Sequence, residues 1–330
     1  MRIALLVASL WLVTSPLWGK IVFYSHRDGN EEIYTMAADG SNPMRLTFNE
    51  ARDTSPAWSP NGQQIAFHSY RDGNAEVYVM DADGSNPRNL TRHPANDRRP
   101  DWSPDGSMIA FNSFRDGAIN IHVMDADGSN VKQLTHMRIE HLELASKPKW
   151  SPDGEWLLFG GDIVEGNLKQ GRQVYAMRPD GSDRWQVSVP ALNAAMFLGG
   201  WSPDGTQVVY KGTIGGDVKD SFAVIATLDR QRAKVIKRED VPLPKLPFSS
   251  VSFGADGKSI LFRGKRADVW NLYRFRLNDR QVIQLTDNPG ADIAPQEWNP
   301  RLSVPPQQGL LPQRWGKLKT EGWLGRRSPK

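Results

Sequence analysis

A short motif recurs along the chain at intervals that indicate a repeat architecture. It reads Trp-Ser-Pro-(Asp/Asn)-Gly, with a weaker copy Phe-Gly-Ala-Asp-Gly and a last copy Trp-Asn-Pro. The aromatic anchors of the six copies are spaced 44, 48, 51, 52 and 45 residues apart; they are Trp58, Trp102, Trp150, Trp201, Phe253 and Trp298. Periods of about 40–50 residues are typical of propellers and solenoids, whose units are single small sheets or helix pairs. The chain is therefore predicted to be a ring or a stack of similar units.

Each repeat has the pattern of four short strands joined by tight turns. In the second copy, Trp102 precedes a Ser-Pro-Asp-Gly turn, and further strands are expected at residues 108–111, 119–124 and 131–135. The turns are rich in Gly, Pro, Asp and Asn, which suit hairpins. The middle strands do not alternate cleanly between apolar and polar residues, which indicates a sheet covered on both faces. Four-stranded sheets packed face to face around an axis meet this requirement, as in a β-propeller.

The number of strands predicts how the ring closes. Five anchors are followed by an apolar strand but Trp298 is not, and one strand without an anchor, residues 21–24, lies at the other end of the chain. Six anchors match six partner strands only if the C-terminal inner strand pairs with the N-terminal strand. Such pairing removes the open edges of the sheets. The predicted fold is all-β, a six-bladed β-propeller of four-stranded antiparallel blades over residues 20–300.

The repeat also resembles that of a known family. Residues 58–84 contain Trp-Ser-Pro-Asn-Gly, Ile-Ala-Phe, Arg-Asp-Gly-Asn and Val-Tyr-Val-Met, and they match the WD40-like repeat of the TolB-type β-propellers nearly throughout. The resemblance extends from Ile21 to Pro300 and implies a six-bladed propeller. TolB carries an α/β domain before its propeller, and the sequence ahead of Ile21 is too short for one. We therefore expect a stand-alone TolB-like propeller rather than TolB itself, to which the role of TolB transfers only by analogy.

The N-terminus differs from the repeats. Arg2 precedes a largely apolar run, residues 3–13, and Pro16 then precedes the small Gly19. This order is typical of a signal peptide cleaved near Gly19, and the run is too short to span a bilayer as a helix. An uncleaved hydrophobic strand is the alternative. We expect a signal peptide over residues 1–19, no transmembrane segment after its removal, and a periplasmic or secreted protein.

Composition excludes several classes of function. The chain has no Cys, which excludes disulfides, Cys-ligated zinc, iron–sulfur clusters and a thiol nucleophile. The formal net charge of +4 arises from a tail, residues 301–330, which holds seven Lys or Arg and one Glu. The rest of the mature chain is slightly acidic, so nucleic acid is not an expected partner. The basic tail, which contains Pro and Trp, either docks a partner, contacts an anionic surface, lies across the propeller or has no role.

Residues just before each anchor are expected to line the central channel. In the second and third copies they include four cations, which would meet between neighbouring blades. Such a cluster suits the carboxylate or phosphate of a ligand. The alternative is that Asp97, Asp101 and their neighbours neutralise these cations. The candidate ligand-binding residues are Arg98, Arg99, Asp101, Lys147 and Lys149.

The loops at the end of the ring where the inner strands begin, the top face, are expected to be unequal. Long loops are expected at residues 136–147, 160–173, 211–220 and 239–248, all in the middle and later copies. Repeat proteins tend to bind their partners through loop insertions on one face. The alternative explanation for the long loops is sequence drift in these blades. We expect an exported, non-catalytic, monomeric scaffold that binds a protein or a cell-envelope component through the top face of blades three to five.

An alternative function is a metal-dependent propeller enzyme, of lyase or lactonase type, acting on a sugar acid or a lactone. Its candidate metal ligands are His136, Glu140 and His141, the one tight His/Glu cluster in the sequence. The cluster falls in one loop, which favours an exposed charged loop instead. No Gly-x-Ser-x-Gly or Gly-rich phosphate motif is present, so no catalytic residue is predicted. We expect no cofactor, with a divalent metal only under this alternative, and a purely structural surface protein is a third hypothesis.

Overall fold

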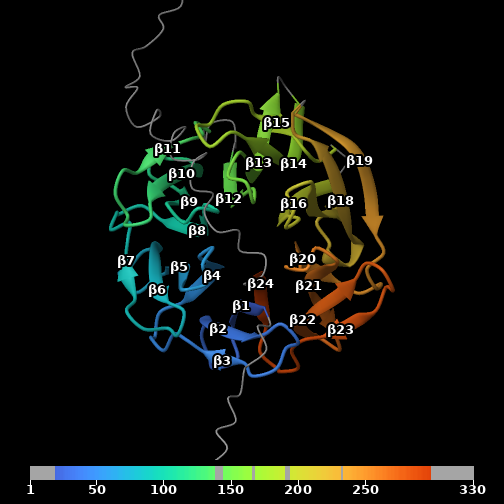
Figure 1. Cartoon of the computed structure of the whole chain (residues 1–330), viewed down its shortest axis with the longest axis horizontal. Coiled ribbons are helices and arrows are strands. Elements are labelled where there is room, and N and C mark those ends of the chain that lie inside the picture. Colours follow the sequence, from blue (N-terminus) through green and yellow to red (C-terminus); the bar gives the residue numbers. More distant parts are fainter. Residues whose placement is uncertain (1–18, 138–143, 166–167, 190–193, 232, 299–330) are drawn as a thin grey trace, which may run out of the picture.

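The computed structural model describes residues 19–137, 144–165, 168–189, 194–231 and 233–298. These residues form six four-stranded antiparallel sheets arranged as a ring around a central axis (Figure 1). The strands extend from Lys20 to Trp298. The predicted six-bladed β-propeller is confirmed, whereas the predicted signal peptide (apart from Gly19) and the basic tail lie outside the described residues. No helix in the described ranges is both long and apolar enough to cross a membrane.

The blades follow the chain, and each begins with its inner strand. Blade 1 contains β4 (Asp53–Trp58), β5 (Gln64–Ser69), β6 (Glu76–Asp81) and β7 (Arg88–Asn89). Blade 2 contains β8 (Asp97–Trp102), β9 (Met108–Ser113), β10 (Asn120–Asp125) and β11 (Lys132–Gln133). Blade 3 contains β12 (Leu144–Trp150), β13 (Leu157–Glu165), β14 (Leu168–Met177) and β15 (Trp185–Gln186).

The remaining blades are built in the same order. Blade 4 contains β16 (Ala194–Trp201), β17 (Gln207–Ile214), β18 (Ser221–Asp229) and β19 (Lys234–Val241). Blade 5 contains β20 (Phe248–Phe253), β21 (Ser259–Arg266), β22 (Val269–Arg276) and β23 (Val282–Gln284). Blade 6 contains β24 (Asp292–Trp298), β1 (Lys20–Ser25), β2 (Glu32–Ala37) and β3 (Met44–Arg45).

Blade 6 joins the two ends of the propeller. Its sheet has the order β24-β1-β2-β3, so a C-terminal inner strand completes a blade whose other strands are N-terminal. In the β1–β24 ladder Lys20 lies opposite Trp298, and Ile21 lies opposite Glu297. The closure predicted from the strand count is therefore confirmed.

The core lies between neighbouring blades rather than at the axis. One cluster joins Val77 and Val79 of blade 1 to Trp102 and Phe111 of blade 2. Complete burial of a side chain such as Phe111 stabilises the fold by about 1.5–3 kcal/mol. Because both faces of each sheet are covered in this way, the middle strands need apolar residues on both faces, which explains the missing alternation.

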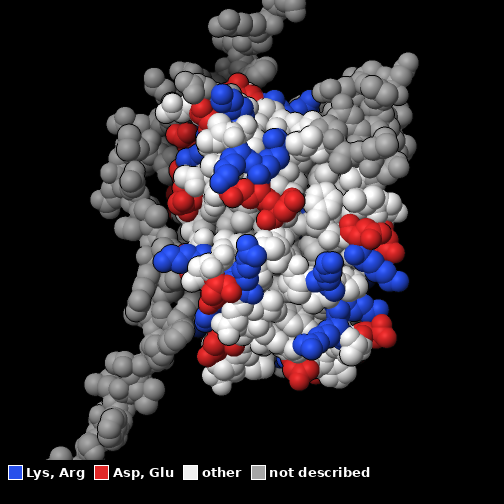
Figure 2. All heavy atoms as spheres, turned by 90° about the vertical axis from the view of Figure 1, so that its right-hand side faces the viewer, with Lys and Arg blue, Asp and Glu red and all other residues white. Residues whose placement is uncertain are grey.

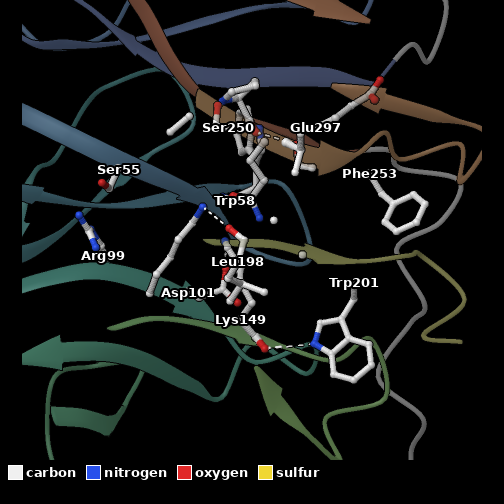
Figure 3. A pocket seen from close by; sticks show the side chains of 18 of the residues that line it. Ser55, Trp58, Arg99, Asp101, Lys149, Leu198, Trp201, Ser250, Phe253 and Glu297 are labelled. Carbon is white, nitrogen blue, oxygen red and sulfur yellow. Dashed lines mark hydrogen bonds and ion pairs between the residues drawn. The ribbon is translucent and has the colours of Figure 1, made fainter. Parts of the chain in front are cut away.

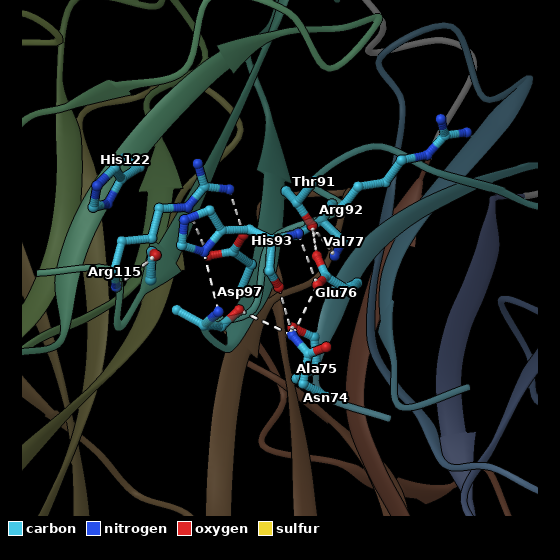
Figure 4. A network of polar contacts seen from close by, with 12 residues as sticks. Asn74, Ala75, Glu76, Val77, Thr91, Arg92, His93, Asp97, Arg115 and His122 are labelled. Atoms are coloured by element: carbon cyan, nitrogen blue, oxygen red, sulfur yellow. Dashed lines mark hydrogen bonds and ion pairs between the residues drawn. The ribbon is translucent and has the colours of Figure 1, made fainter. Parts of the chain in front are cut away.

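A polar network fixes the passage from one blade to the next (Figure 4). The buried carboxylate of Glu76 accepts hydrogen bonds from the Thr91 hydroxyl, from the His93 backbone N–H at 3.0 Å and from the Asn74 amide at 2.8 Å. The Thr91 hydroxyl in turn accepts from the Val77 backbone N–H at 3.0 Å. The same contact between a middle strand and the residue two positions after the outer strand recurs at Glu32–Thr47, Asn120–Thr135, Gln173–Ser188 and Asn271–Thr286.

Blades 3, 4 and 5 depart from the short-strand pattern at the top face, and in blade 5 both β21 and β22 have 8 residues. Residues 160–173 were expected to be a loop but continue the β13–β14 ladder, with Glu165 opposite Leu168. In blade 4, β17 likewise extends to Ile214, and the outer strand β19 has 8 residues, against 2 in blade 1. Extending the ladder satisfies backbone N–H and C=O groups that an open loop would leave to water.

Candidate functional site

The inner strands carry an irregularity beside the channel. Ser55, Arg99, Lys147 and Ala294 occupy the same place in four blades, each directly before a proline, with φ of 51°, 55°, 56° and 52°. In the β8–β9 ladder the register shifts between Arg98 and Asp101. A left-handed backbone costs a residue other than glycine about 1–2 kcal/mol. All four of these residues line the central cavity.

The cavity occupies the channel, has a volume of about 670 Å³ and is lined by residues of all six blades (Figure 3). This volume lies within the range of about 300–1,000 Å³ that small-molecule sites occupy. The six aromatic anchors also line it. The anchors of the first five copies are buried, and Trp298 packs against Trp58 with ring centroids 6.1 Å apart.

Positive charge predominates in the cavity. In the described part of the chain six cations line it, namely Arg99, Lys147, Lys149, Arg172, Lys211 and Arg263, against two carboxylates, Asp101 and Glu297. Asp101 pairs with Lys149, and Glu297 pairs with Arg274 at 2.9 Å, a residue that does not line the cavity. On the outer surface in Figure 2, by contrast, acidic and basic side chains are interspersed.

Four of the six cations form no ion pair with any carboxylate in the described part of the chain. Arg172 has Asp162 at 3.5 Å, and Lys149 has Asp101. The cations that remain are Arg99, Lys147, Lys211 and Arg263, the last of which donates to the Ser249 hydroxyl at 3.3 Å. This excess of unneutralised charge makes the channel suited to anions.

Two of these lysines have lowered pKa values. Lys147 donates from Nζ to the Leu198 carbonyl at 2.9 Å; desolvation in the channel, together with Lys149 and Arg99, lowers its pKa to about 7. Lys211 is 5% exposed, and burial lowers its pKa to about 8. Its ammonium lies 5.0 Å from the ring centroid of Phe197, which also has a cation–π contact with Arg172.

The structure brings four of the five candidate ligand-binding residues together in the cavity: Arg99, Asp101, Lys147 and Lys149. Arg98 is not among the lining residues, and its guanidinium lies 5.5 Å from the Tyr70 ring centroid. Asp97, expected under the alternative to neutralise channel cations, pairs with Arg115 at 2.5 Å. Of the four candidate cations, only Lys149 has an ion pair within the described ranges, with Asp101, as that alternative expects.

Sequence reasoning missed three cations and one aromatic residue of the cavity. Arg172, Lys211 and Arg263 lie on β14, β17 and β21, and Phe197 lies on β16. The available signal was Lys211, a charged residue that directly follows Val208, Val209 and Tyr210 in an apolar strand. A buried, unpaired lysine at such a place is uncommon and favours a functional site.

The candidate metal ligands are described only in part. His136 is exposed, while Glu140 and His141 lie outside the described residues. Within the described ranges, no group of three or more His, Cys, Asp or Glu residues is arranged to hold a metal ion.

These features define the protein as an all-β propeller with a basic central channel. A family model described as the TolB beta propeller domain matches residues 50–240, which is more than half of the chain. The chain therefore belongs to the TolB β-propeller domain family.

Curated relatives match only in short segments. The chain is 49% identical over 49 residues to the Tol-Pal system protein TolB of Geobacter sulfurreducens, covering 15% of this chain and 11% of that protein. It is 50% identical over 44 residues to the protein of the same name from Desulfosudis oleivorans, covering 13% and 10%. The matches therefore span about a tenth of the length of these relatives.

Solved structures share the fold at low sequence identity. TolB from Acinetobacter baumannii has a TM-score of 0.67 and 20% identity, over 84% of this chain and 66% of that chain. An oligogalacturonate lyase in complex with manganese has a TM-score of 0.56 and 16% identity, over 80% of this chain and 72% of that chain. At such identities these similarities show the fold alone, which hosts both kinds of protein.

Proposed function

We propose that the protein is an exported, non-catalytic binding module that takes a protein or a cell-envelope component at its top face. The observation that carries this proposal is the placement of exposed apolar side chains. Phe48, Phe114, Val189 and Ile214 are 73%, 42%, 45% and 51% exposed, and each lies in a connection or strand end at the top face. Large apolar side chains exposed on the same face as the inserted hairpins favour contact with another macromolecule at that face.

Three further features support the proposal. The extended hairpins of blades 3 and 4 project at the same face, where repeat proteins commonly bind. The curated relatives are named as members of a Tol-Pal system, a name that indicates an assembly of proteins. The apolar run at residues 3–13 supports export, which would place the propeller in or beyond the cell envelope.

Affinity capture from an envelope extract of the source cells would test the proposal. The top-face variant combines Phe114→Ser, Val189→Ser and Ile214→Ser, and the matched control combines Ile236→Ser and Val282→Ser, exposed residues on the outer strands β19 and β23. We expect a discrete partner to be retained by the native protein and by the control but lost by the top-face variant. Equal retention by both variants would contradict binding at the top face.

A further inference from the structure

We propose that the central channel binds a multivalent anion, a ligand with two or more carboxylate or phosphate groups, seated between the inner walls of blades 2, 3 and 4 and the facing wall of blade 5. This site lies within the channel and is independent of any partner at the top face. It rests on the cations that line the cavity, on their cost to the fold and on unpaired donors across the channel.

The cations of blades 2, 3 and 4 form one continuous arc. Lys149 and Arg99 contribute to the lowered pKa of Lys147, and Arg172 contributes to the lowered pKa of Arg99, so these groups lie within electrostatic reach of one another. Arg172 and Lys211 then share the Phe197 ring, at 5.8 Å and 5.0 Å from its centroid. A ligand in the cavity would therefore meet several positive groups at once.

The arc is not needed to build the propeller. Arg99 and Lys147 occupy the left-handed positions of the inner strands, and the equivalent positions of blades 1 and 6 hold the neutral Ser55 and Ala294. The irregularity therefore forms without a cation. Cations placed close together in a partly enclosed site disfavour one another's charged state, and an anion would relieve that repulsion. Repulsion that the fold does not require, concentrated at one place, favours a binding role.

The wall formed by β20 and β21 adds donors without partners. Ser250 Oγ and Arg263 Nε are buried, and neither has a hydrogen-bond partner among the described residues. Both residues line the cavity. Buried polar groups are rarely left unpaired, since each costs free energy, and a ligand oxygen in the channel would satisfy them.

The ligand is inferred to be an anion, and a multivalent one, from charge and size. Both lining carboxylates already have cationic partners, so they offer little to a bound cation. A cavity of about 670 Å³ is far larger than a single carboxylate or phosphate group needs. The cations of the arc lie on four different strands, β8, β12, β14 and β17. They are therefore placed to contact separate charged groups of one ligand, and a ligand with a single charged group could not contact them all.

Calorimetric titration of the purified protein at fixed ionic strength would test the site. The probes are citrate for carboxylates, pyrophosphate for phosphates, acetate as a single carboxylate and glucose as a neutral polyol. We expect citrate or pyrophosphate to bind one to one, acetate to bind at least about tenfold more weakly, and glucose not to bind. The preferred probe distinguishes carboxylate from phosphate ligands. No binding of either multivalent probe, or acetate binding as tightly as citrate, would overturn the proposal.

Single substitutions locate the site. Lys147→Gln and Lys211→Gln should each weaken the better probe by about 10-fold to 100-fold, as expected for a lost charge-assisted contact. The control is Lys237→Gln, on the exposed strand β19, where Lys237 pairs with Glu239 at 2.9 Å. An equal loss in the control would show unspecific attraction and refute a channel site.

The pH dependence gives a readout that a structural role would not produce. Sulfate is the probe because its charge is constant near neutrality, while Lys147 and Lys211 lose their protons in that range. Arg99, Arg172, Lys149 and Asp101 also face the site. Sulfate affinity should fall about tenfold between about pH 6 and pH 8. Lys147→Arg, which cannot lose its charge in this range, should bind sulfate with a flatter profile. An unchanged profile in that variant would contradict contact between Lys147 and the anion.

Discussion

Gly84 offers a sharp test of how neighbouring blades interlock. It lies in the turn between β6 and β7 of blade 1, with φ of 89°. A Cβ at this position would lie 2.6 Å from the carbonyl oxygen of Leu46 and 3.2 Å from its Cα, after the outer strand of blade 6. The same approach to a leucine carbonyl of the preceding blade recurs at Gly40, Gly128 and Gly181. We predict that Gly84→Ala pushes blades 6 and 1 apart.

Gly73 is the matched control for this substitution. It has φ of 95° in the Arg-Asp-Gly turn of the same blade, and no atom lies within 4 Å of its ideal Cβ position. Both alanine variants suffer the left-handed backbone, about 1–2 kcal/mol. Only Gly84→Ala also meets backbone atoms that no side-chain rotation can move, and such overpacking costs about 1–3 kcal/mol more. The expected losses of unfolding free energy are therefore about 1–2 kcal/mol for Gly73→Ala and about 2–5 kcal/mol for Gly84→Ala.

Urea unfolding followed by tryptophan fluorescence measures both variants. The midpoint should fall further for Gly84→Ala, and the denaturant slope should stay unchanged if the unfolded states are alike. Equal losses in the two variants would refute the argument, because they would show that the blade interface yields without cost. A larger loss for Gly73→Ala would also contradict the argument, because it would show that the Arg-Asp-Gly turn is more sensitive to alanine than the blade interface is.

Three further predictions concern closure, pH and metals. Trp298→Ala should lower the unfolding free energy by about 2–4 kcal/mol, since its partly buried indole packs against Trp58 and its N–H donates to the Pro60 carbonyl at 2.9 Å; a loss no larger than that of the exposed Phe48→Ala would contradict this. Burial, with nearby arginines, lowers the pKa of His68 to about 3, so the unfolded chain binds the extra proton below about pH 6.5. Stability should fall as pH drops from there toward 4, and less steeply in His68→Asn; identical slopes would exclude His68 as the cause. Excess Ca²⁺, Mn²⁺ or Zn²⁺ should leave the melting temperature in EDTA unchanged to about 1 °C, and a rise of several degrees for one ion would revive the metal-dependent enzyme.

The sequence was sufficient for the fold because each anchor meets the same surroundings. Trp58 and Trp102 are both buried between neighbouring blades, so the number of residues from one anchor to the next equals the length of one blade. Closure followed from the unmatched strand at residues 21–24. Both inferences rest on features that recur along the chain, so several copies support each of them.

The site was less accessible to sequence reasoning, for two physical reasons. The register shift between Arg98 and Asp101 breaks the two-residue alternation, so sequence alone could not tell which of two adjacent arginines lines the channel. Arg172 and Lys211 reach the channel from the long hairpins of blades 3 and 4, which were expected to be loops. Their contribution depends on how far each ladder extends, and no local motif indicates that extent.

The two halves of the ring differ in how their inner strands begin at the top face. In blades 6, 1 and 2 the inner strand begins with a buried aspartate held by the arginine of an Arg-Asp-Gly turn, as in Asp53–Arg71 at 2.8 Å and Asp292–Arg27 at 2.9 Å. In blades 4 and 5 the inner strands begin at Ala194 and Phe248 instead. Removing one partner of such a buried pair costs about 3–5 kcal/mol, so these aspartate–arginine pairs constrain their blades strongly. The extended hairpins of blades 3 and 4 lie in the half of the ring where no described inner strand begins with such an aspartate, since β12 of blade 3 begins at Leu144. Lys147 and Lys211 line the channel in this same half, which the aspartate–arginine pairs do not constrain.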